Sequence, residues 1–239
     1  MHRFFVDAPP AERAFLRGEQ ARQIASVLRL RPGERIVLVA DLVEHEVELQ
    51  AVAPAQVTGR VVARRPVATE LPVRLTLAVP LLKGDRSEEV IEGASQLGVS
   101  RFVPFSSSRS VVRELSVAKR ERWRKIAREA AEIAHRGAVP RVDELVSWGA
   151  LFARLDGRIV VCWEEATGPH LLDATRDGDL SLVVGPEGGL SADEVETARG
   201  HDAAIASLGK RILRAETAAL AAVAVVVGRL DNMDARSGA

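Results

Sequence analysis

The feature that most constrains the fold is an alternation of short apolar segments with helical segments, which runs from residue 73 to residue 230. The apolar segments carry few polar residues on either face, as expected of strands that helices cover on both sides. Regular alternation of such strands with helices predicts an α/β fold around a parallel sheet. We expect strands at 73–82, 101–105, 158–163, 180–184 and 203–208, and helices at 87–97, 117–135, 191–199 and 216–230.

The first third of the chain has a different pattern and predicts a small β-rich unit. Residues 19–30 have the character of a short helix, and three later segments with partly alternating polarity resemble strands. A polar segment with two prolines, residues 64–72, is typical of a linker. The expected strands are 36–40, 45–52 and 57–63.

Chain length and composition fit one large domain or two modest ones, and the change of pattern along the chain favours two, which we place at 1–70 and 73–232. The chain has 239 residues, of which 47% are hydrophobic, yet its longest apolar run, 218–227, is too short to span a bilayer. The charged N-terminus, MHRFF, lacks the apolar stretch of an export signal. The single cysteine, Cys162, lies in an apolar run and cannot form an intrachain disulfide. These features predict a cytoplasmic protein without a membrane segment, whose last residues, 231–239, are frayed.

The net charge is zero, but the charges are unevenly distributed along the chain. Residues 101–141 contain 11 Lys and Arg against 4 Asp and Glu, whereas residues 142–206 contain 4 against 13. A basic face of this kind suits a polyanion, and the alternative is a set of ordinary solvated helix faces. The chain has no tyrosine and only 4% aromatic residues, which argues against extensive base stacking on aromatic platforms.

Two loops that follow predicted strands stand out. The first, GPEGG (185–189), leads into a helix that begins with a capping box of Ser191 and Glu194, and the second is LGKRILRAET (208–217). Neither matches a P-loop or a Rossmann turn. Ligands of open parallel sheets bind where the loops after the strands gather. We therefore interpret the two loops as a candidate site, with two ordinary tight turns as the alternative.

Other common chemistries have little support in the sequence. The five histidines are scattered, and none pairs with another at the spacing of metal ligands. A G-x-S-x-G nucleophile motif is absent. A metal-free transferase or a binding module therefore fits better than a hydrolase.

As whole strings, the two loops resemble a known signature. VGPEGGLSADE (184–194) followed by LGKRILRAETAAL (208–220) resembles the 16S ribosomal RNA uridine-N3 methyltransferase family, which belongs to the SPOUT superfamily of S-adenosylmethionine-dependent enzymes. The resemblance continues through most of the chain, in segments that occur in the expected order. These are MHRFF (1–5), VLRLRPGERI (27–36), LLKGDRSEEVIEGASQLGV (81–99), PFSSSRSVV (104–112), ERWRKIAREAAE (121–132) and VPRV (139–142).

The resemblance implies an N-terminal PUA-like RNA-binding barrel and a C-terminal SPOUT domain with a trefoil knot at about residues 180–230, although true knots are rare. It also implies a homodimer that methylates N3 of one uridine in 16S ribosomal RNA of the 30S subunit. S-adenosylmethionine, held between the two loops, is the implied methyl donor, and no metal is implied. The implied cofactor-binding residues are Val184, Gly185, Glu187, Gly188, Gly189, Leu208, Gly209, Ile212, Leu213 and Thr217.

Methylation at N3 requires removal of a weakly acidic proton or stabilisation of the developing anion. Arg214 is the candidate for holding a uracil oxygen or a phosphate, with an ordinary surface arginine as the alternative. Glu216 is the candidate for accepting a proton or orienting a neighbour, with a helix-capping role as the alternative. The general base is not assigned. The candidate RNA contacts are Arg3, Arg29, Lys83, Arg86, Arg109 and Arg136, and for Arg109 and Arg136 a structural ion pair is the alternative.

Three positions depart from the family pattern. Gln23 stands where a histidine is common, Ala40-Asp41 replaces an Asp-Gly pair, and Ile133 replaces the glutamine of a Glu-Gln pair. None of these positions lies in the two loops. Two other functions remain open: a SPOUT methyltransferase with another target, such as a ribose 2′-OH or another base, and an RNA-binding or ribosome-assembly protein that binds no methyl donor.

Overall fold

The structure is a computed structural model that describes residues 1–237, and the chain divides into two compact units. The first unit comprises Met1–Glu70 together with Ala131–Val139. The second comprises Leu71–Ala130 and the chain from Pro140 onward. Each unit has its own sheet and its own hydrophobic core, so each is described by itself.

The first unit is built on a five-stranded sheet. Its strands are β1 (His2–Phe5), β2 (Arg13–Arg17), β3 (Arg35–Ala40), β4 (Val43–Val52) and β5 (Gln56–Pro66). The strand order is β1-β3-β4-β5-β2, in which β1 pairs parallel with β3 and all other neighbours are antiparallel. A short helix, α1 (Gly18–Arg22), follows β2 and continues as one π-helical turn, η1 (Gln23–Val27).

One hydrophobic core fills the inner face of this sheet. Along β4, buried side chains alternate with more exposed ones, because successive residues of a strand point to opposite faces. Val47 and Leu49 of β4 pack there with Leu16 of β2 and with Ala21 and Ile24 of the helical segment. The helix therefore covers the inner face of β2 and leaves its outer face open.

A second segment of the chain, 131–139, joins the first unit through two buried arginines. The guanidinium group of Arg136, which is 2% exposed, donates to both carboxylate oxygens of Glu70, at 3.2 and 2.7 Å. Arg3 donates to Glu44 at 2.7 Å and to two carbonyl oxygens of the segment at 3.3 Å. Burial by itself raises the pKa of Glu70, but the hydrogen bond and the charge of Arg136 outweigh it and lower that pKa below its ordinary value.

The second unit is built on a parallel sheet. Its strands are β6 (Leu75–Pro80), β7 (Arg101–Ser106), β8 (Arg141–Val142), β9 (Val146–Ser147), β10 (Arg158–Cys162), β11 (Leu180–Val184) and β12 (Ala204–Ala206). The strand order is β12-β10-β11-β6-β7-β8, with β9 also paired to β7, and every pair is parallel. The helices are α2 (Arg86–Gln96), α3 (Val117–Ile133), α4 (Trp148–Leu151) with the 3₁₀ turn η2 (Phe152–Arg154), α5 (Leu171–Ala174), α6 (Ala192–Gly200) and α7 (Ala215–Ser237).

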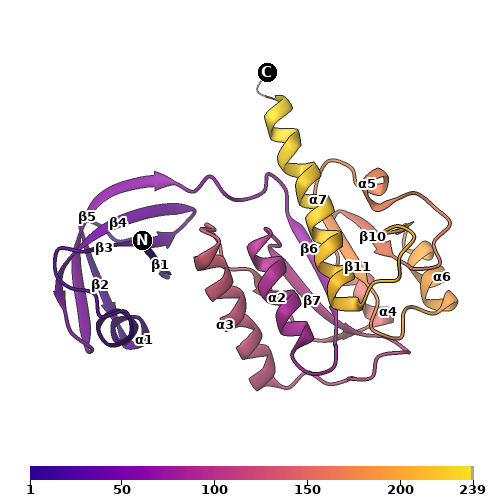
Figure 1. Cartoon of the computed structure of the whole chain (residues 1–239), viewed down its shortest axis with the longest axis horizontal. Coiled ribbons are helices and arrows are strands. Elements are labelled where there is room, and N and C mark those ends of the chain that lie inside the picture. Colours follow the sequence, from indigo (N-terminus) through magenta and orange to yellow (C-terminus); the bar gives the residue numbers. More distant parts are fainter. Residues whose placement is uncertain (238–239) are drawn as a thin grey trace. The chain divides into compact units, whose positions relative to one another are not determined.

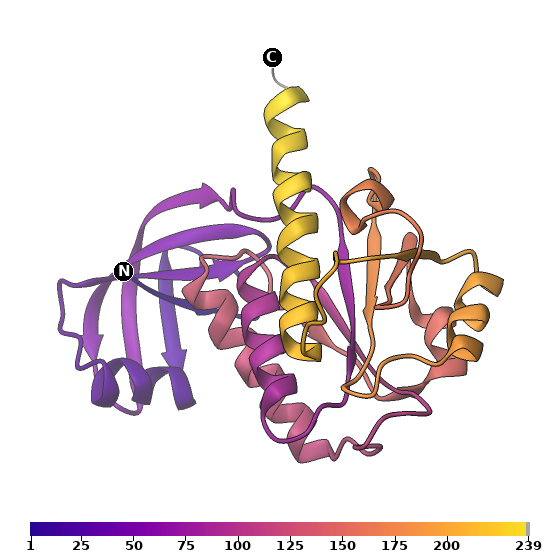
Figure 2. The same cartoon turned by 45° about the vertical axis from the view of Figure 1, so that its right-hand side comes forward.

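Helices cover both faces of this sheet, and the strands supply a core to each side. Helices α2, α3 and α7 lie on one face (Figure 1), where Leu75, Leu77 and Val79 of β6 point into the larger core. On the other face, Ala78 of the same strand joins a second core that includes Trp148 of α4 and residues of α6. Figure 2 shows α7 alongside α2, against which it packs. Because the strands are buried on both faces, their sequences are almost wholly apolar, as the sequence indicated.

The predicted α/β fold, with a parallel sheet after a β-rich N-terminal unit, is confirmed. Two local expectations are wrong. Residues 64–66 extend β5 instead of starting a linker, because their main chains pair with β4 at Val43, Glu44 and His45. Residues 231–237 continue α7 instead of fraying, whereas 238 and 239 lie outside the described residues.

Six short elements were not expected from the sequence, whereas the equally short β10, β11 and β12 were expected from their apolar residues. β1, β2, β8, β9, α4 and α5 each contain five residues or fewer, which is too short for a period of two or of 3.6 to be recognised. Within residues 1–237, no helix is long and apolar enough to cross a membrane.

Candidate active site

A cavity of about 530 Å³ lies in the second unit, where three neighbouring parallel strands end. β12, β10 and β11 are adjacent in the sheet and run in the same direction, so the loops that follow them gather at one edge. These loops supply most of the lining, and the last residues of β10 and β11 and the first turns of α2 and α7 supply the remainder. The lining residues are Arg86, Cys162, Trp163, Glu164, Val184, Gly185, Pro186, Glu187, Gly189, Ser207, Leu208, Gly209, Arg211, Ile212, Leu213, Arg214, Ala215 and Ala218.

The loop after β11 is a tight turn held by its own main chain. The N–H of Gly189 donates to the carbonyl oxygen of Pro186 at 2.9 Å, and Gly189 has a φ of +69°. A Cβ at this position would clash with the carboxylate of Glu164. The left-handed backbone therefore favours glycine here, and a Cβ would displace the flexible carboxylate of Glu164 from its present position.

Helix α6 begins directly after this turn, and the predicted capping box is confirmed. Ser191 Oγ accepts a hydrogen bond from the N–H of Glu194 at 3.2 Å, and Glu194 Oε2 accepts one from the N–H of Ser191 at 2.9 Å. The other oxygen, Oε1, accepts a hydrogen bond from the N–H of Ser108 at 2.7 Å. The positive end of α6 is thus already occupied by a carboxylate, so an anionic ligand gains little there.

The loop after β12 leaves main-chain donors unused. The N–H of Gly209 donates to Ser207 Oγ at 3.0 Å. In the part of the chain that the structure describes, the N–H groups of Leu208, Ile212 and Leu213 have no hydrogen-bond partner, and all three residues line the cavity. Main-chain polar groups are normally satisfied by protein, water or ligand. This loop therefore offers donors to a bound molecule.

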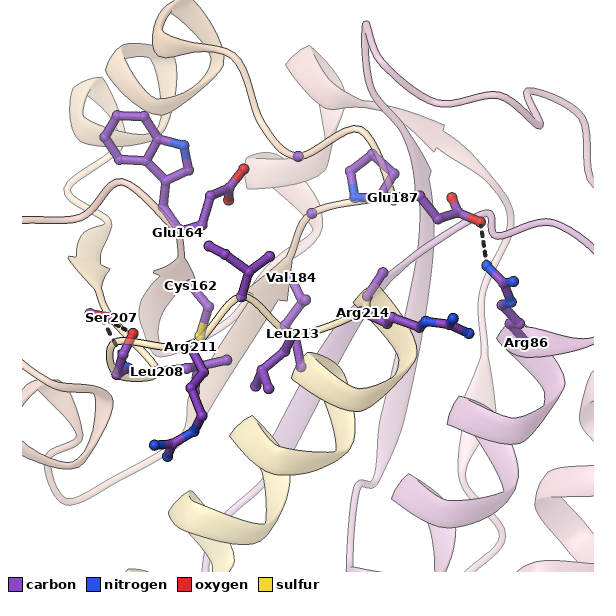
Figure 3. A pocket seen from close by; sticks show the side chains of 18 residues that line it. Arg86, Cys162, Glu164, Val184, Glu187, Ser207, Leu208, Arg211, Leu213 and Arg214 are labelled. Atoms are coloured by element: carbon purple, nitrogen blue, oxygen red, sulfur yellow. Dashed lines mark hydrogen bonds and ion pairs between the residues drawn. The ribbon is translucent and has the colours of Figure 1, made fainter.

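One side of the cavity carries an ion-pair network centred on Arg86. The guanidinium nitrogens of Arg86 lie 3.6 Å from Glu187 Oε1 and 3.8 Å from Glu216 Oε1. Glu187 Oε1 also accepts the main-chain N–H of Lys83 at 3.0 Å, and Glu216 Oε2 is buried without a partner among the described residues. Figure 3 shows Arg214 extending from the start of α7 toward Arg86 and Glu187. The cavity therefore has a charged side with both signs in close contact.

The floor of the cavity is apolar and uncharged. Val184 at the end of β11, Ala218 of α7 and Cys162 at the end of β10 contribute to it. Burial raises the pKa of the Cys162 thiol to about 12, so the sulfur stays protonated and is a poor nucleophile and a poor metal ligand. The described residues contain no group of three or more His, Cys, Asp or Glu side chains arranged to hold a metal ion.

S-adenosylmethionine fits this cavity in size and in chemistry. A volume of about 530 Å³ falls within the range of about 300–1,000 Å³ that is usual for small-molecule sites. The apolar floor suits the adenine ring, and the unused main-chain donors suit its polar edge and the ribose. The carboxylates of Glu164 and Glu187 suit the positively charged groups of the molecule.

Most residues predicted to bind the cofactor line the cavity, as does the predicted catalytic Arg214. These cofactor residues are Val184, Gly185, Glu187, Gly189, Leu208, Gly209, Ile212 and Leu213. Gly188, Thr217 and Glu216 do not line it. Gly188 packs against Arg109, whose Nη1 donates to the Gly188 carbonyl oxygen at 3.2 Å. Arg109 is exposed and forms no ion pair among the described residues, so its contact with RNA stays a prediction. Glu216 faces the site only through its contact with Arg86.

The residues predicted to contact RNA are divided between the two units, with Arg3, Arg29 and Arg136 in the first and Lys83, Arg86 and Arg109 in the second. Arg3 and Arg136 are buried within the first unit, and their guanidinium groups donate to internal carboxylates and carbonyl groups, so their contact with RNA stays a prediction. Arg29, also in the first unit, is exposed, at a φ of +54°. In the second unit, Arg86 lines the cavity, and the main-chain N–H of Lys83 donates to the lining residue Glu187. Arg109 contacts Gly188, which does not line the cavity.

Several lining residues were missed from the sequence, chiefly Cys162, Trp163 and Glu164, which end β10 and follow it. Trp163 donates its indole N–H to the carbonyl oxygen of Leu190 at 3.3 Å and so ties this strand end to the turn after β11. The only sequence feature that could have indicated these residues was the predicted strand at 158–163. Its end joins the site because β10 lies between β12 and β11, an order that the sequence pattern does not specify. Ser207, directly before the second loop, and Arg211, within it, were also missed.

Comparisons of sequence point to RNA methylation. A family model described as an RNA methyltransferase domain matches residues 69–227, more than half of the chain. The ribosomal RNA small subunit methyltransferase E of Bacillus subtilis is 35% identical over 95% of this chain and 96% of its own length. The protein of the same name from Mycobacterium tuberculosis is 36% identical over 95% of this chain and 93% of its own.

Comparisons of structure agree with those of sequence. The ribosomal RNA small subunit methyltransferase E of Neisseria gonorrhoeae, solved bound to S-adenosyl methionine, is 27% identical with a TM-score of 0.88 and covers 96% of this chain and 98% of its own. A putative methyltransferase of Legionella pneumophila, solved with bound cofactor SAM, is 27% identical with a TM-score of 0.85 over 95% of this chain and 97% of its own. The likeness therefore extends over both units.

Proposed function

Since this chain belongs to the family of the ribosomal RNA small subunit methyltransferase E, we propose that it transfers the methyl group of S-adenosylmethionine to N3 of one uridine in 16S ribosomal RNA. The observation that carries the proposal is the cavity at the ends of β12, β10 and β11, with its apolar floor and unused main-chain donors. A cavity of this kind suits a nucleoside that is bound by main-chain groups, because charged side chains such as Arg214 are then available to the substrate.

The cofactor would be held by the loops after β11 and β12. Main-chain groups at Gly185, Leu208 and Leu213 are available to the adenosine, and Gly189 allows Glu164 to approach the same space. When bound, S-adenosylmethionine supplies a methyl group attached to a positively charged sulfur, which is already a good leaving group. The chain then has to position the two reactants, exclude water and stabilise charge on the base.

Arg214 is the residue that we propose for charge stabilisation. Its guanidinium group lines the cavity without an ionic partner among residues 1–237, so its charge is available to a substrate. Loss of the N3 proton spreads negative charge onto the uracil oxygens, which a planar guanidinium group binds well. Arg86 lies within ion-pair distance of both Glu187 and Glu216, so these carboxylates are paired with Arg86 and not with Arg214. We propose that Arg86 and Glu216 position Arg214 and the start of α7, and that Glu187 acts at the cofactor.

We also propose the finer fold and assembly that the family likeness implies. In this proposal, residues 1–70 form a PUA-like RNA-binding barrel, and residues 73–232 form a SPOUT domain with a trefoil knot at about 180–230. The strand order supports the knot, because the chain leaves β12 at the sheet edge and crosses the ends of β10 and β11 before α7 packs near β11. We propose a cytoplasmic homodimer in which copies pack along α7, and sedimentation of the purified protein tests that assembly.

The experiment that tests the activity uses the purified chain, S-adenosylmethionine and 30S subunits from cells that lack the enzyme. Nucleoside mass spectrometry of the product is expected to show 3-methyluridine in 16S ribosomal RNA. A 2′-O-methylated nucleoside or another methylated base would instead support a different target. Absence of methyl transfer, together with no binding of S-adenosylhomocysteine in calorimetry, would support a binding protein without catalytic activity.

A further inference from the structure

The outer face of strand β2, in the first unit, carries an exposed aromatic residue between two arginines. Residues of β2 alternate strictly, so that Ala14 and Leu16 are buried while Arg13, Phe15 and Arg17 are exposed on the opposite face. The buried pair belongs to the core under α1, and the exposed three have no described role. β2 is an edge strand, next to β5 (Figure 1).

Phe15 is an exception among the phenylalanines of this chain. Its side chain is 61% exposed, whereas the other five, Phe4, Phe5, Phe102, Phe105 and Phe152, are each 7% exposed or less. An isolated exposed apolar residue is common on protein surfaces and needs no explanation by itself. A second observation is that Arg13 and Arg17 flank Phe15 on the same face. An aromatic ring between two positive charges suits a ligand that has both planar rings and negative charge.

The arginines of this face are close enough to repel one another. Arg13 stands directly opposite Arg60 of β5, and Arg17 stands opposite Gln56. Like charges directly opposite each other destabilise a sheet. Arg60 has a long contact of 3.7 Å with Glu48, but Arg13 and Arg17 have no ionic partner within the described residues. An anion bound on this face would relieve the repulsion that the fold leaves in place.

We propose that this outer face, formed by Arg13, Phe15, Arg17 and Arg60, binds single-stranded RNA. A base stacks on the ring of Phe15, and the arginines hold phosphates on either side of it. Arg13 and Arg17 are four residues apart along an extended strand, about 13 Å, which leaves Phe15 centred between them. Stacking on one exposed ring is compatible with any base, so this surface supplies affinity and not sequence specificity. Its relevance to catalysis rests on the proposed function, in which RNA is the substrate.

The charge of the face favours RNA over a protein strand. An open edge strand also attracts other strands, but positively charged side chains on an edge oppose that pairing. Of the four residues of the face, only Arg60 has an ionic partner among the described residues, and that partner, Glu48, is shared with Arg35. Arg13 and Arg17 therefore leave positive charge on this face. A second copy of the chain would bring the same arginines together and be repelled.

Fluorescence anisotropy with a labelled 12-nucleotide single-stranded RNA of mixed sequence tests the proposal. Phe15→Ala is expected to weaken binding by about 5- to 150-fold, because one base–aromatic stack is lost, while the salt dependence stays unchanged. Arg13→Gln combined with Arg17→Gln is expected to lower the slope of log Kd against log salt by about 1.4, for two phosphate contacts to a single strand. Phe15→Trp should retain the affinity of the wild type.

Matched substitutions at other exposed positions provide the controls. Leu172→Ala removes another exposed apolar side chain, 42% exposed, and Arg199→Gln removes another exposed arginine. Neither is expected to change RNA affinity. All variants should bind S-adenosylhomocysteine like the wild type, which verifies that they are folded.

Two results would overturn the proposal: unchanged affinity in Phe15→Ala, or full affinity in Phe15→Leu, which keeps apolar area without an aromatic ring. Self-association that disappears in Phe15→Ala, without RNA binding, would assign the face to a second copy instead. The RNA-binding measurement is independent of methyl transfer. If the chain binds RNA through this face but does not methylate 30S subunits, the proposed activity fails and the binding surface stands.

Discussion

The two ends of the parallel sheet in the second unit differ in how far their arginines are paired with carboxylates of the chain. At the end where the strands begin, arginines are paired with carboxylates of the chain. Arg74 donates to Asp179 through its main-chain N–H at 2.8 Å and its side chain at 2.6 and 2.9 Å. Arg101 reaches Asp143 at 2.6 Å and Asp156 at 2.9 Å.

At the end where the strands finish, the chain leaves donors without internal partners. Arg211 and Arg214 line the cavity with no ion pair among the described residues, and neighbouring main-chain N–H groups are also unused. Arg86 is paired with Glu187 and Glu216 at this end, but Arg211 and Arg214 are available to a ligand, whereas Arg74 and Arg101 at the other end are both paired. The difference follows from topology, because the functional loops of a parallel sheet collect at the carboxyl ends of its strands.

The largest expected effect is on kcat, and it should differ between an arginine at one end of the sheet and an arginine at the other. Arg214→Gln should lower kcat for methyl transfer by about 100- to 1,000-fold, as expected for loss of one donor to a developing anion. Arg74→Gln, the matched change at the other end, should leave kcat unchanged. Steady-state methyl transfer to 30S subunits measures both. Similar losses of kcat in the two variants would remove the distinction between the two ends.

The next effect compares two glycines with positive φ. Gly178, in the turn before β11, has a φ of +98° and open space around its Cα, whereas a Cβ at Gly189 would clash with Glu164. Gly178→Ala and Gly189→Ala should each lower the free energy of unfolding by about 1 kcal/mol, from backbone strain. Only Gly189→Ala should also weaken S-adenosylmethionine binding, by about tenfold for 1.4 kcal/mol. Urea unfolding and calorimetry measure the two quantities, and equal affinities would refute the role of Gly189.

A smaller effect, on stability alone, belongs to the end where the strands begin. Hydrogen bonds from the main chain and the side chain of Arg74 lower the pKa of Asp179 below its ordinary 3.8. A carboxylate whose pKa is lower in the folded state stabilises the fold above its unfolded-state value, and this contribution is lost as the pH falls through the folded-state pKa. Asp179→Asn should therefore be less stable than the wild type at pH 7, and the difference should close below pH 3.8. If the pairing is unimportant, denaturation curves will show the same difference in free energy of unfolding between variant and wild type at every pH in this range.

The smallest effect concerns Cys162 in the cavity floor. Its pKa of about 12 keeps the thiol neutral throughout the range in which the protein is assayed. Cys162→Ala should therefore leave the shape of the pH profile of methyl transfer unchanged between pH 7 and 10. A titration that is present in the wild type and missing in the variant would show that the sulfur ionises within the site.

Much of the site was visible in the sequence, because its parts are local. The turn at 185–189 and the capping box of Ser191 and Glu194 are encoded by neighbouring residues, and both appear in the structure as predicted. Glu164 and Arg136 show where local reasoning stopped. Glu164 enters the site from a third strand end, and Arg136 is buried against Glu70, 66 residues away in the sequence.

The sequence by itself determined the alternation of apolar strands with helices, the glycine turn and the helix start that follows it, because these depend on residues a few positions apart. Only the tertiary structure decided that β10 lies between β12 and β11, and hence which three loops enclose the cavity. The order of strands is fixed by packing between residues distant in sequence, which local periodicity does not record. The same long-range packing left Arg214 without an internal carboxylate and gave Arg74 one.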